Sequence, residues 1–139
     1  MADIVVRRCI ATDPSSTALM LAGPGAFELW PGIEAVGETE GHLHLAVPGV
    51  GDEVPVDVEL LAPSRTATGF VLRFVGEGND RAVPGELRLR AASDADFRTE
   101  AELRLGYPED GPAADELRRM AERFVTNLMS AAEARSRVA

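Results

Sequence analysis

The segment from Pro112 to about Arg137 constrains the fold more than any other part of the sequence. Apolar residues recur along it at spacings of three and four, at Leu117, Met120, Ala121, Phe124, Leu128 and Ala131. This spacing puts them on one side of an α-helix. Gly111 ends the preceding segment, and Pro112 suits the first helical position. Such a helix would be about 39 Å long and needs an apolar partner of similar length.

The sequence upstream predicts a sheet as that partner. Apolar and polar residues alternate there in short stretches, which is typical of antiparallel strands with one buried face. We predict strands over residues 3–11, 33–39, 42–47, 54–60, 66–75, 86–91 and 97–107. The second and third of these should form a hairpin around Glu40-Gly41. Residues 48–53 and 76–85 are expected to be loops.

Two short helices are predicted between the first two strands. Thr12 or Asp13 suits a helix cap, and Pro14 lies just inside. Gly23-Pro24-Gly25 ends this helix, and residues 26–30 form one further helical turn before Pro31-Gly32. The predicted fold is therefore α+β: a curved seven-stranded antiparallel sheet, two short helices after the first strand, and a long C-terminal helix over an internal cavity, all in one domain over residues 1–139.

This order of elements resembles the START-related or SRPBCC superfamily, also called the Bet v 1-like or helix-grip fold. Ala11-Thr12-Asp13-Pro14 and Leu29-Trp30-Pro31-Gly32-Ile33 are similar to the alanine-proline helix start and the tryptophan-proline entry to strand two of that superfamily, although Asp13 intervenes before the first proline. The run from Pro31-Gly32-Ile33 through Gly85-Glu86-Leu87-Arg88-Leu89, with the final helix, resembles the branch that contains the G subunit of carbon monoxide dehydrogenase. The resemblance implies a cavity between sheet and helix that takes lipids, hormones, polyketides or other apolar molecules, and in some members catalyses aromatic cyclisation.

Composition excludes several classes of function. The chain has 23 acidic and 14 basic residues, a formal charge of −9, so a nucleic-acid backbone would be repelled. No run of about 18 apolar residues exists, and we expect no stable membrane insertion and a cytoplasmic protein. The single cysteine, Cys9, is expected to be a small buried core residue. Motifs for phosphate-bearing cofactors are missing, and we predict no cofactor.

The candidate binding residues are those that would face the predicted cavity. Most are apolar, and two could add polarity: Asn127 on the flank of the helix and Tyr107 at the end of a strand, since pockets combine apolar walls with a few polar groups. The set for the cavity or its gate comprises Phe27, Trp30, Phe70, Leu72, Phe74, Tyr107, Met120, Phe124, Asn127 and Leu128. The alternative is that these residues simply fill a core.

A gate is predicted over residues 23–32, together with the loops at 48–52 and 76–80. The first segment combines proline and glycine with large apolar residues, so it should be locally unstable yet able to cover a cavity. In the alternative, Trp30 plugs one end of the core.

Other polar residues have simpler interpretations. His42 and His44 could hold a metal, but Leu43 and Leu45 make the better buried face, so we expect both histidines in solvent and no metal site. Charged residues on the opposite face of the late strands should form cross-strand ion pairs on an exposed surface; they are Arg88, Arg90, Arg98, Glu100, Glu102 and Arg104.

Three functions fit the sequence. The first is binding of a small hydrophobic ligand that is lipid, quinone or polyketide-like. The second is an enzyme of the polyketide cyclase or dehydratase type, in which Tyr107, Asn127 or a buried acid assists proton transfer. The third, implied by the resemblance to the carbon monoxide dehydrogenase branch, is an accessory protein for a larger redox enzyme. A homodimer or a protein partner remains open, and no catalytic residue is assigned.

Overall fold

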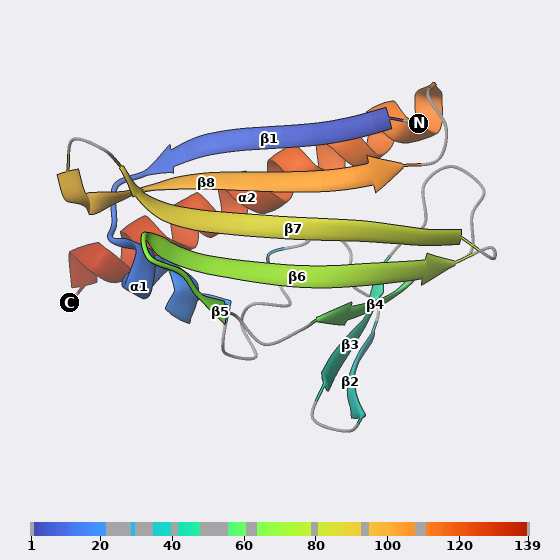
Figure 1. The fold of residues 1–139 in the computed structure, drawn as a ribbon, viewed down its shortest axis with the longest axis horizontal. Coiled ribbons are helices and arrows are strands. Elements are labelled where there is room, and N and C mark those ends of the chain that lie inside the picture. The colour runs from blue at the N-terminus through green and yellow to red at the C-terminus, as the bar shows by residue number, and fades with distance from the viewer. Residues whose placement is uncertain are drawn as a thin grey trace.

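The computed structural model describes residues 2–21, 29, 35–39, 42–47, 56–60, 64–78, 81–92, 95–107 and 111–138. The elements are β1 (Ala2–Ile10), α1 (Pro14–Leu19), β2 (Ala35–Thr39), β3 (His42–Val47), β4 (Val56–Leu60), β5 (Ser64–Arg65), β6 (Gly69–Gly78), β7 (Arg81–Ala92), β8 (Ala95–Tyr107) and α2 (Pro112–Val138). The sheet order is β1-β8-β7-β6-β4-β3-β2, and β5 pairs with β6. Figure 1 shows α2 lying along one face of this sheet.

The predicted α+β architecture is confirmed, with differences in detail. Antiparallel pairing of β2 with β3, which places Thr39 opposite His42, confirms the hairpin. Among the described residues the sheet has eight strands rather than seven, because Ser64 and Arg65 pair with Val71 and Phe70 as the short strand β5. The predicted helical turn at 26–30 lies outside the described residues, except for Leu29.

The prediction of a loop over residues 76–85 is wrong. The ladder between β6 and β7 continues through this stretch, from Val75 opposite Pro84 to Gly78 opposite Arg81. Proline is poorly tolerated inside a sheet because it lacks an N–H donor. Here the described pairing of β7 with β8 begins only at Gly85, so Pro84 lies where β7 pairs on the β6 side alone. The glycines and proline that indicated a break are therefore compatible with a strand.

The core lies between α2 and the first strands of the sheet order. Leu87 and Leu103 on the neighbouring strands β7 and β8 have no exposed surface, and the same holds for Leu128 on α2. The helix packs most closely on β1 and to a lesser extent on β8. Its fully or almost fully buried residues are Ala114, Ala121, Val125, Leu128 and Ala132. Three of these five are alanines, which allow the helix backbone to approach the sheet closely.

This close approach rotates the helix relative to the predicted stripe. Val125 is completely buried, although the sequence pattern did not single it out. Phe124, expected at the centre of the buried side, is only half-buried at its flank, and Leu117 and Met120 share that position. The start of the helix is as predicted: α2 begins at Pro112, directly after Gly111, whose φ of 125° favours glycine.

Helix α1 is fixed to the end of the sheet by a small buried polar network. Asp13 caps the helix, as predicted, by accepting a hydrogen bond from Ser16 N at 3.0 Å. The Thr17 hydroxyl donates to the Asp13 carbonyl oxygen at 2.9 Å, and the Thr99 hydroxyl of β8 donates to the Thr12 carbonyl oxygen at 2.6 Å. Thr17 and Thr99 have no exposed surface. Thr12 is thus tied to β8 by a hydrogen bond, and the Thr17 hydroxyl of α1 lies 3.5 Å from the Thr99 hydroxyl of β8.

We expect Thr99→Val to destabilise the protein by about 1–3 kcal/mol, because it leaves the buried Thr12 carbonyl oxygen without its donor. Thr126→Val, the same change at an exposed position of α2, should stay within about 0.5 kcal/mol of wild type. Urea unfolding of both variants measures the difference. Equal effects at the two positions would contradict a stabilising role for the network.

Candidate functional site

The inner face of β6 carries three of the predicted binding residues. Phe70, Leu72 and Phe74 alternate along this strand, and all three belong to or pack against the core. Leu72 is only 7% exposed, whereas Phe70 and Phe74 keep part of their surface accessible. The structure therefore brings these residues to the side of the sheet that α2 covers.

Gly85 of β7 determines where the Phe74 ring lies. The two residues are paired across β6 and β7, and a Cβ atom on Gly85 would come within 2.1 Å of Phe74 Cε2. The same Cβ would lie 2.8 Å from Leu105 Cδ2. Phe74 thus packs over the bare glycine backbone, and any side chain at position 85 would displace the ring.

The middle of α2 carries the helical part of the predicted site. Met120 and Phe124 are half-buried and pack against the core, and Leu128 is completely buried. Helix α2 packs mainly on β1 and less on α1 and β8. Met120 and Phe124 lie at the flank of the buried side of α2 and are only partly covered. These two residues, with Phe70 and Phe74, form an apolar set of partly accessible side chains.

Asn127 is engaged in a specific contact. Its Nδ2 donates a hydrogen bond of 2.8 Å to the carbonyl oxygen of Leu29, which is itself only 8% exposed. The predicted role of this amide was to face a ligand. In the structure one of its N–H groups instead ties α2 to the connection between α1 and β2. Its amide oxygen remains able to accept a hydrogen bond.

Several predictions fall outside the described residues. Phe27 and Trp30, and the side chain of Tyr107 at the end of β8, are among them. Most residues of the predicted gate at 23–32, and the loop at 48–52, also lie outside the described residues. His42 and His44 lie in β3 opposite Thr39 and Gly37, but the positions of their side chains are not described. The gate segments at 23–32 and 48–52 and the solvent-facing histidines therefore stay predictions. The third gate segment, predicted as a loop at 76–80, is wrong for residues 76–78, which belong to strand β6.

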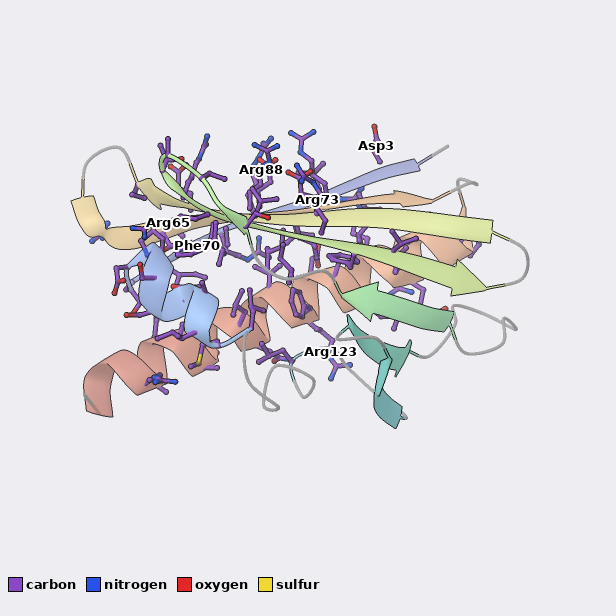
Figure 2. All side chains as sticks on the ribbon, turned by 60° about the horizontal axis from the view of Figure 1, so that its bottom comes forward. Asp3, Arg65, Phe70, Arg73, Arg88 and Arg123 are labelled. Carbon is purple, nitrogen blue, oxygen red and sulfur yellow. The ribbon has the colours of Figure 1, made fainter. Side chains whose placement is uncertain are left out.

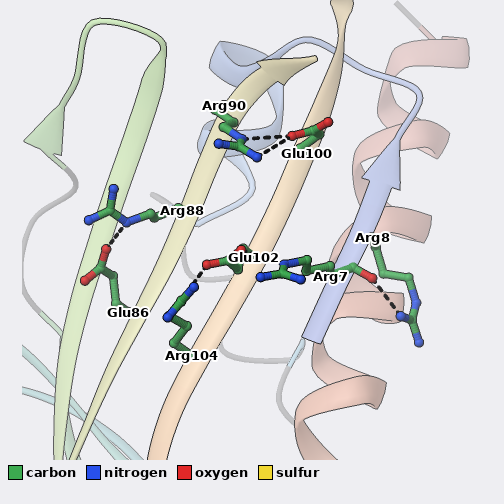
Figure 3. A network of polar contacts seen from close by, with 8 residues as sticks. All are labelled: Arg7, Arg8, Glu86, Arg88, Arg90, Glu100, Glu102 and Arg104. Carbon is green, nitrogen blue, oxygen red and sulfur yellow. Dashed lines mark hydrogen bonds and ion pairs between the residues drawn. The ribbon is translucent and has the colours of Figure 1, made fainter. Parts of the chain in front are cut away.

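The outer face of the sheet carries ion pairs, as predicted. Arg7 of β1 pairs with Glu102 of β8 at 2.7 Å, and Arg90 of β7 pairs with Glu100 of β8 at 2.8 Å. Figure 3 shows this network, which also includes two pairs within single strands: Arg104 with Glu102 at 2.5 Å, and Arg88 with Glu86. Neither Arg7 nor Glu86 was among the residues predicted for it.

Cys9 lies on this outer face rather than in the core, so the expectation of a buried thiol is wrong. It is exposed and lies opposite Glu100 in the ladder of β1 and β8. The inward positions of β1 are occupied by Ile4, Val6 and Ile10, and strand alternation sends Cys9 to the other side.

Glu102 is the most strongly perturbed acid of the outer face. Hydrogen bonds from Arg7 and then Arg104 lower the pKa of Glu102 to about 2 from its ordinary value of 4.5. A carboxylate that accepts two guanidinium hydrogen bonds strongly favours its charged form. Glu102 therefore stays ionised and holds the two arginines in position.

A trough of about 1140 Å³ lies over this network. Its walls and floor are formed by Arg7, Arg8, Cys9, Thr66, Ala67, Thr68, Phe70, Val71, Glu86, Arg88, Leu89, Arg90, Glu100, Ala101, Glu102 and Arg104. The turn from β5 to β6 closes one end, where Gly69 permits a close backbone approach: a Cβ there would meet the Leu89 carbonyl oxygen at 1.9 Å. Sequence reasoning identified the charges but not the trough.

Comparison with known proteins defines the fold. No family model matches the sequence, and no curated protein matches it. Solved structures do match: TTHA0849 from Thermus thermophilus has a TM-score of 0.72 at 16% identity, over 97% of this chain and 99% of that one. XoxI from Bacillus cereus has a TM-score of 0.67 at 15% identity, over 94% and 95%. Ara h 8.0201, a Bet v 1 homologue, has a TM-score of 0.57 at 12% identity, over 96% and 98%.

The fold is Bet v 1-like. At these identities the likeness concerns the fold alone, and the predicted helix-grip arrangement of sheet and C-terminal helix is confirmed at that level. The narrower resemblance to the carbon monoxide dehydrogenase branch stays a prediction. In the described part of the chain, neither helix combines the length and apolar character that crossing a bilayer requires.

Leu128 and Phe124 should respond differently to truncation. We expect Leu128→Ala to cost about 2–5 kcal/mol, because Leu128 is completely buried. Phe124→Ala should cost less than the roughly 3–5 kcal/mol typical of a fully packed phenylalanine, because part of the ring is accessible. Chemical denaturation measures both values. A larger loss for Phe124→Ala than for Leu128→Ala would show that position 124 is packed solid.

Glu102 gives a prediction for acidic pH. Because its pKa is lowered, its ionised form stabilises the fold at pH values above 4.5, and this contribution is lost as the pH falls through about 2. Glu102→Gln should therefore lower the free energy of unfolding at neutral pH. The difference from wild type should become smaller as the pH falls from 4.5 to 2. Carboxyl-detected NMR of Arg7→Gln/Arg104→Gln should find the titration of Glu102 moved up toward its ordinary range. If the Glu102 carboxyl of the wild-type protein titrated with a midpoint in that ordinary range, this interpretation would be contradicted.

Proposed function

We propose that this protein binds a small apolar molecule between the inner face of the sheet and α2. The observation that carries the proposal is the uneven burial of the inward-facing side chains. Next to β1, the helix residues Val125 and Leu128 are completely buried. Toward β6, Phe74 and Phe124 retain accessible surface although they pack against the core.

The chemistry of these side chains selects for an apolar ligand. Aromatic and methionine side chains provide large, adaptable contact surfaces for hydrophobic molecules. Asn127 adds one polar group, whose amide oxygen could accept a hydrogen bond from a ligand hydroxyl while its N–H holds Leu29. A lipid, quinone or polyketide-like molecule with a single hydroxyl suits this arrangement.

The comparisons support a binding function in a general sense only. Bet v 1-like folds suggest ligand binding, and Ara h 8.0201 matches almost the whole chain. The polyketide cyclase or dehydratase and the redox-enzyme accessory remain alternatives. Of the two residues named for proton transfer, Asn127 carries no ionisable group, and the side chain of Tyr107 lies outside the described residues.

A neutral fluorescent probe tests this proposal without interference from the charged outer face. N-phenyl-1-naphthylamine should bind wild type with one-to-one stoichiometry and be displaced by a long-chain alcohol or a quinone. Met120→Gln should weaken binding about tenfold or more, because a buried amide without a partner costs about 1–3 kcal/mol. Leu19→Gln makes a matched change at an exposed position of α1 and should leave binding unaltered.

Native mass spectrometry of freshly purified protein provides an independent measurement. The proposal fails if wild type neither carries a co-purified apolar molecule nor binds the probe. It also fails if Met120→Gln and Leu19→Gln weaken binding equally, since the probe would then bind elsewhere. Thermal unfolding of both variants shows whether each remains folded.

A further inference from the structure

The distribution of charge along the chain is strongly uneven. Residues 9–64 contain nine acidic residues and no arginine or lysine, whereas the rest of the chain contains fourteen of each sign. The whole net charge of −9 therefore comes from residues 9–64. All fourteen basic residues are arginines, and lysine is absent. Arginine is the side chain best suited to hold a carboxylate through two parallel hydrogen bonds.

Five of these arginines line the outer trough, against three glutamates. They are Arg7, Arg8, Arg88, Arg90 and Arg104, with Glu86, Glu100 and Glu102. Figure 2 shows Arg73 and Arg88 projecting from the face of the sheet opposite to α2. The trough thus carries an excess of positive charge on a chain that is acidic as a whole. Phe70 contributes to both the trough and the inner apolar set, but the ion-paired arginines and glutamates lie on the outer face of the sheet.

The geometry of the ion pairs leaves the arginines able to bind a further partner. Arg7, Arg88 and Arg104 each contact their glutamate through Nε. The two terminal nitrogens of each guanidinium form a second edge of this planar group, which does not include Nε. This edge can donate two parallel hydrogen bonds to a carboxylate. The side chains of Arg7, Arg88 and Arg104 are 68%, 56% and 57% exposed, respectively. The edge formed by their terminal nitrogens is therefore accessible. Because the glutamates already restrict the arginines, less side-chain entropy is lost on binding.

We propose that the trough is a docking surface for a carboxylate-rich, extended segment of a partner protein. Its arginines belong to three neighbouring strands in the order β1-β8-β7, which spread across about 10 Å. One small anion cannot reach all of them. An extended segment can, because alternate side chains of a strand lie on one face about 7 Å apart, the spacing of Arg88 and Arg90 along β7.

A nucleic acid is a poorer occupant of the same trough. Glu86, Glu100 and Glu102 lie among the arginines and would repel a continuous run of phosphates. They tolerate a segment in which carboxylates alternate with neutral residues. Thr66, Ala67 and Thr68, which close one end of the trough, are small, exposed and uncharged, so they do not repel a carboxylate-rich segment.

The test uses a fluorescein-labelled peptide in which glutamate alternates with serine over about ten residues, long enough to cross the trough. Fluorescence anisotropy should show binding to wild type at about 10 mM salt that weakens at about 150 mM, where the Debye length falls from about 30 Å to about 8 Å. A peptide with lysine in place of glutamate should not bind. An oligothymidylate of equal charge should bind more weakly than the glutamate peptide.

Matched variants separate the trough from overall charge. Arg88→Gln/Arg104→Gln should weaken peptide binding at least about tenfold, the loss expected when hydrogen bonds to charged groups are removed. Arg118→Gln/Arg119→Gln makes the same charge change at exposed positions of α2 and should have little effect. Arg88→Lys/Arg104→Lys keeps the positive charge but removes the planar guanidinium groups, which donate two parallel hydrogen bonds to one carboxylate. This variant should therefore also bind the peptide more weakly.

Three outcomes would overturn the proposal: no binding of the glutamate peptide to wild type at low salt, equal losses in the two glutamine variants, or tighter binding of the oligothymidylate. If Arg88→Gln/Arg104→Gln unfolds, the lysine variant decides the question alone. Binding of N-phenyl-1-naphthylamine to the same variants should be unchanged, which keeps this test independent of the inner site.

Discussion

The close contact of α2 with β1 and β8 is the constraint on which the rest of this structure depends. A helix of 27 residues has one apolar side that must be buried over its whole length. Ala114, Ala121 and Ala132 allow it to approach the sheet, and Val125 and Leu128 fill the contact completely. Because this contact lies toward one edge of the sheet, the inner side of β6 is left with aromatic residues that are only partly covered. The proposed binding site is therefore a consequence of where the helix packs.

Much of the fold could be predicted from local chemistry. Pro112 after Gly111, and Asp13 before Pro14, mark helix starts by mechanisms that require few neighbours. Strand alternation likewise indicates which side of β8 is buried. The rotation of α2 could not be predicted in the same way, because the apolar stripe is broad and the choice between Phe124 and Val125 depends on how closely the helix approaches the sheet. Pro84 indicated a loop because its tolerance in β7 depends on strand pairing, which sequence alone does not reveal.

The apolar nature of the candidate site could be predicted from the sequence better than the specific contacts of its residues. Phe70, Phe74, Met120 and Phe124 are partly buried and pack against the core, and their role in binding stays a prediction. The partner of Asn127 was not foreseen, since a hydrogen bond to the Leu29 carbonyl oxygen depends on how the chain after α1 returns across the helix. On the outer face, the alternation of arginine and glutamate was interpreted as solvated ion pairs. That interpretation is correct for the pairs but does not predict the trough, one end of which is formed by the turn before Gly69.

The two faces of the sheet are mechanically linked through their common strands. Leu87 and Leu103 are paired across β7 and β8 inside the protein, and Glu86 and Arg104 are the next pair along the same ladder on the outside. The register that packs the core thus also fixes the spacing of the outer charges. Arginines on a helix surface, such as Arg118, have no such constraint from cross-strand partners. An array of arginines held at fixed spacing by a buried core loses little freedom when it binds an extended segment, which is the physical reason to expect recognition from this face rather than from the basic residues of α2.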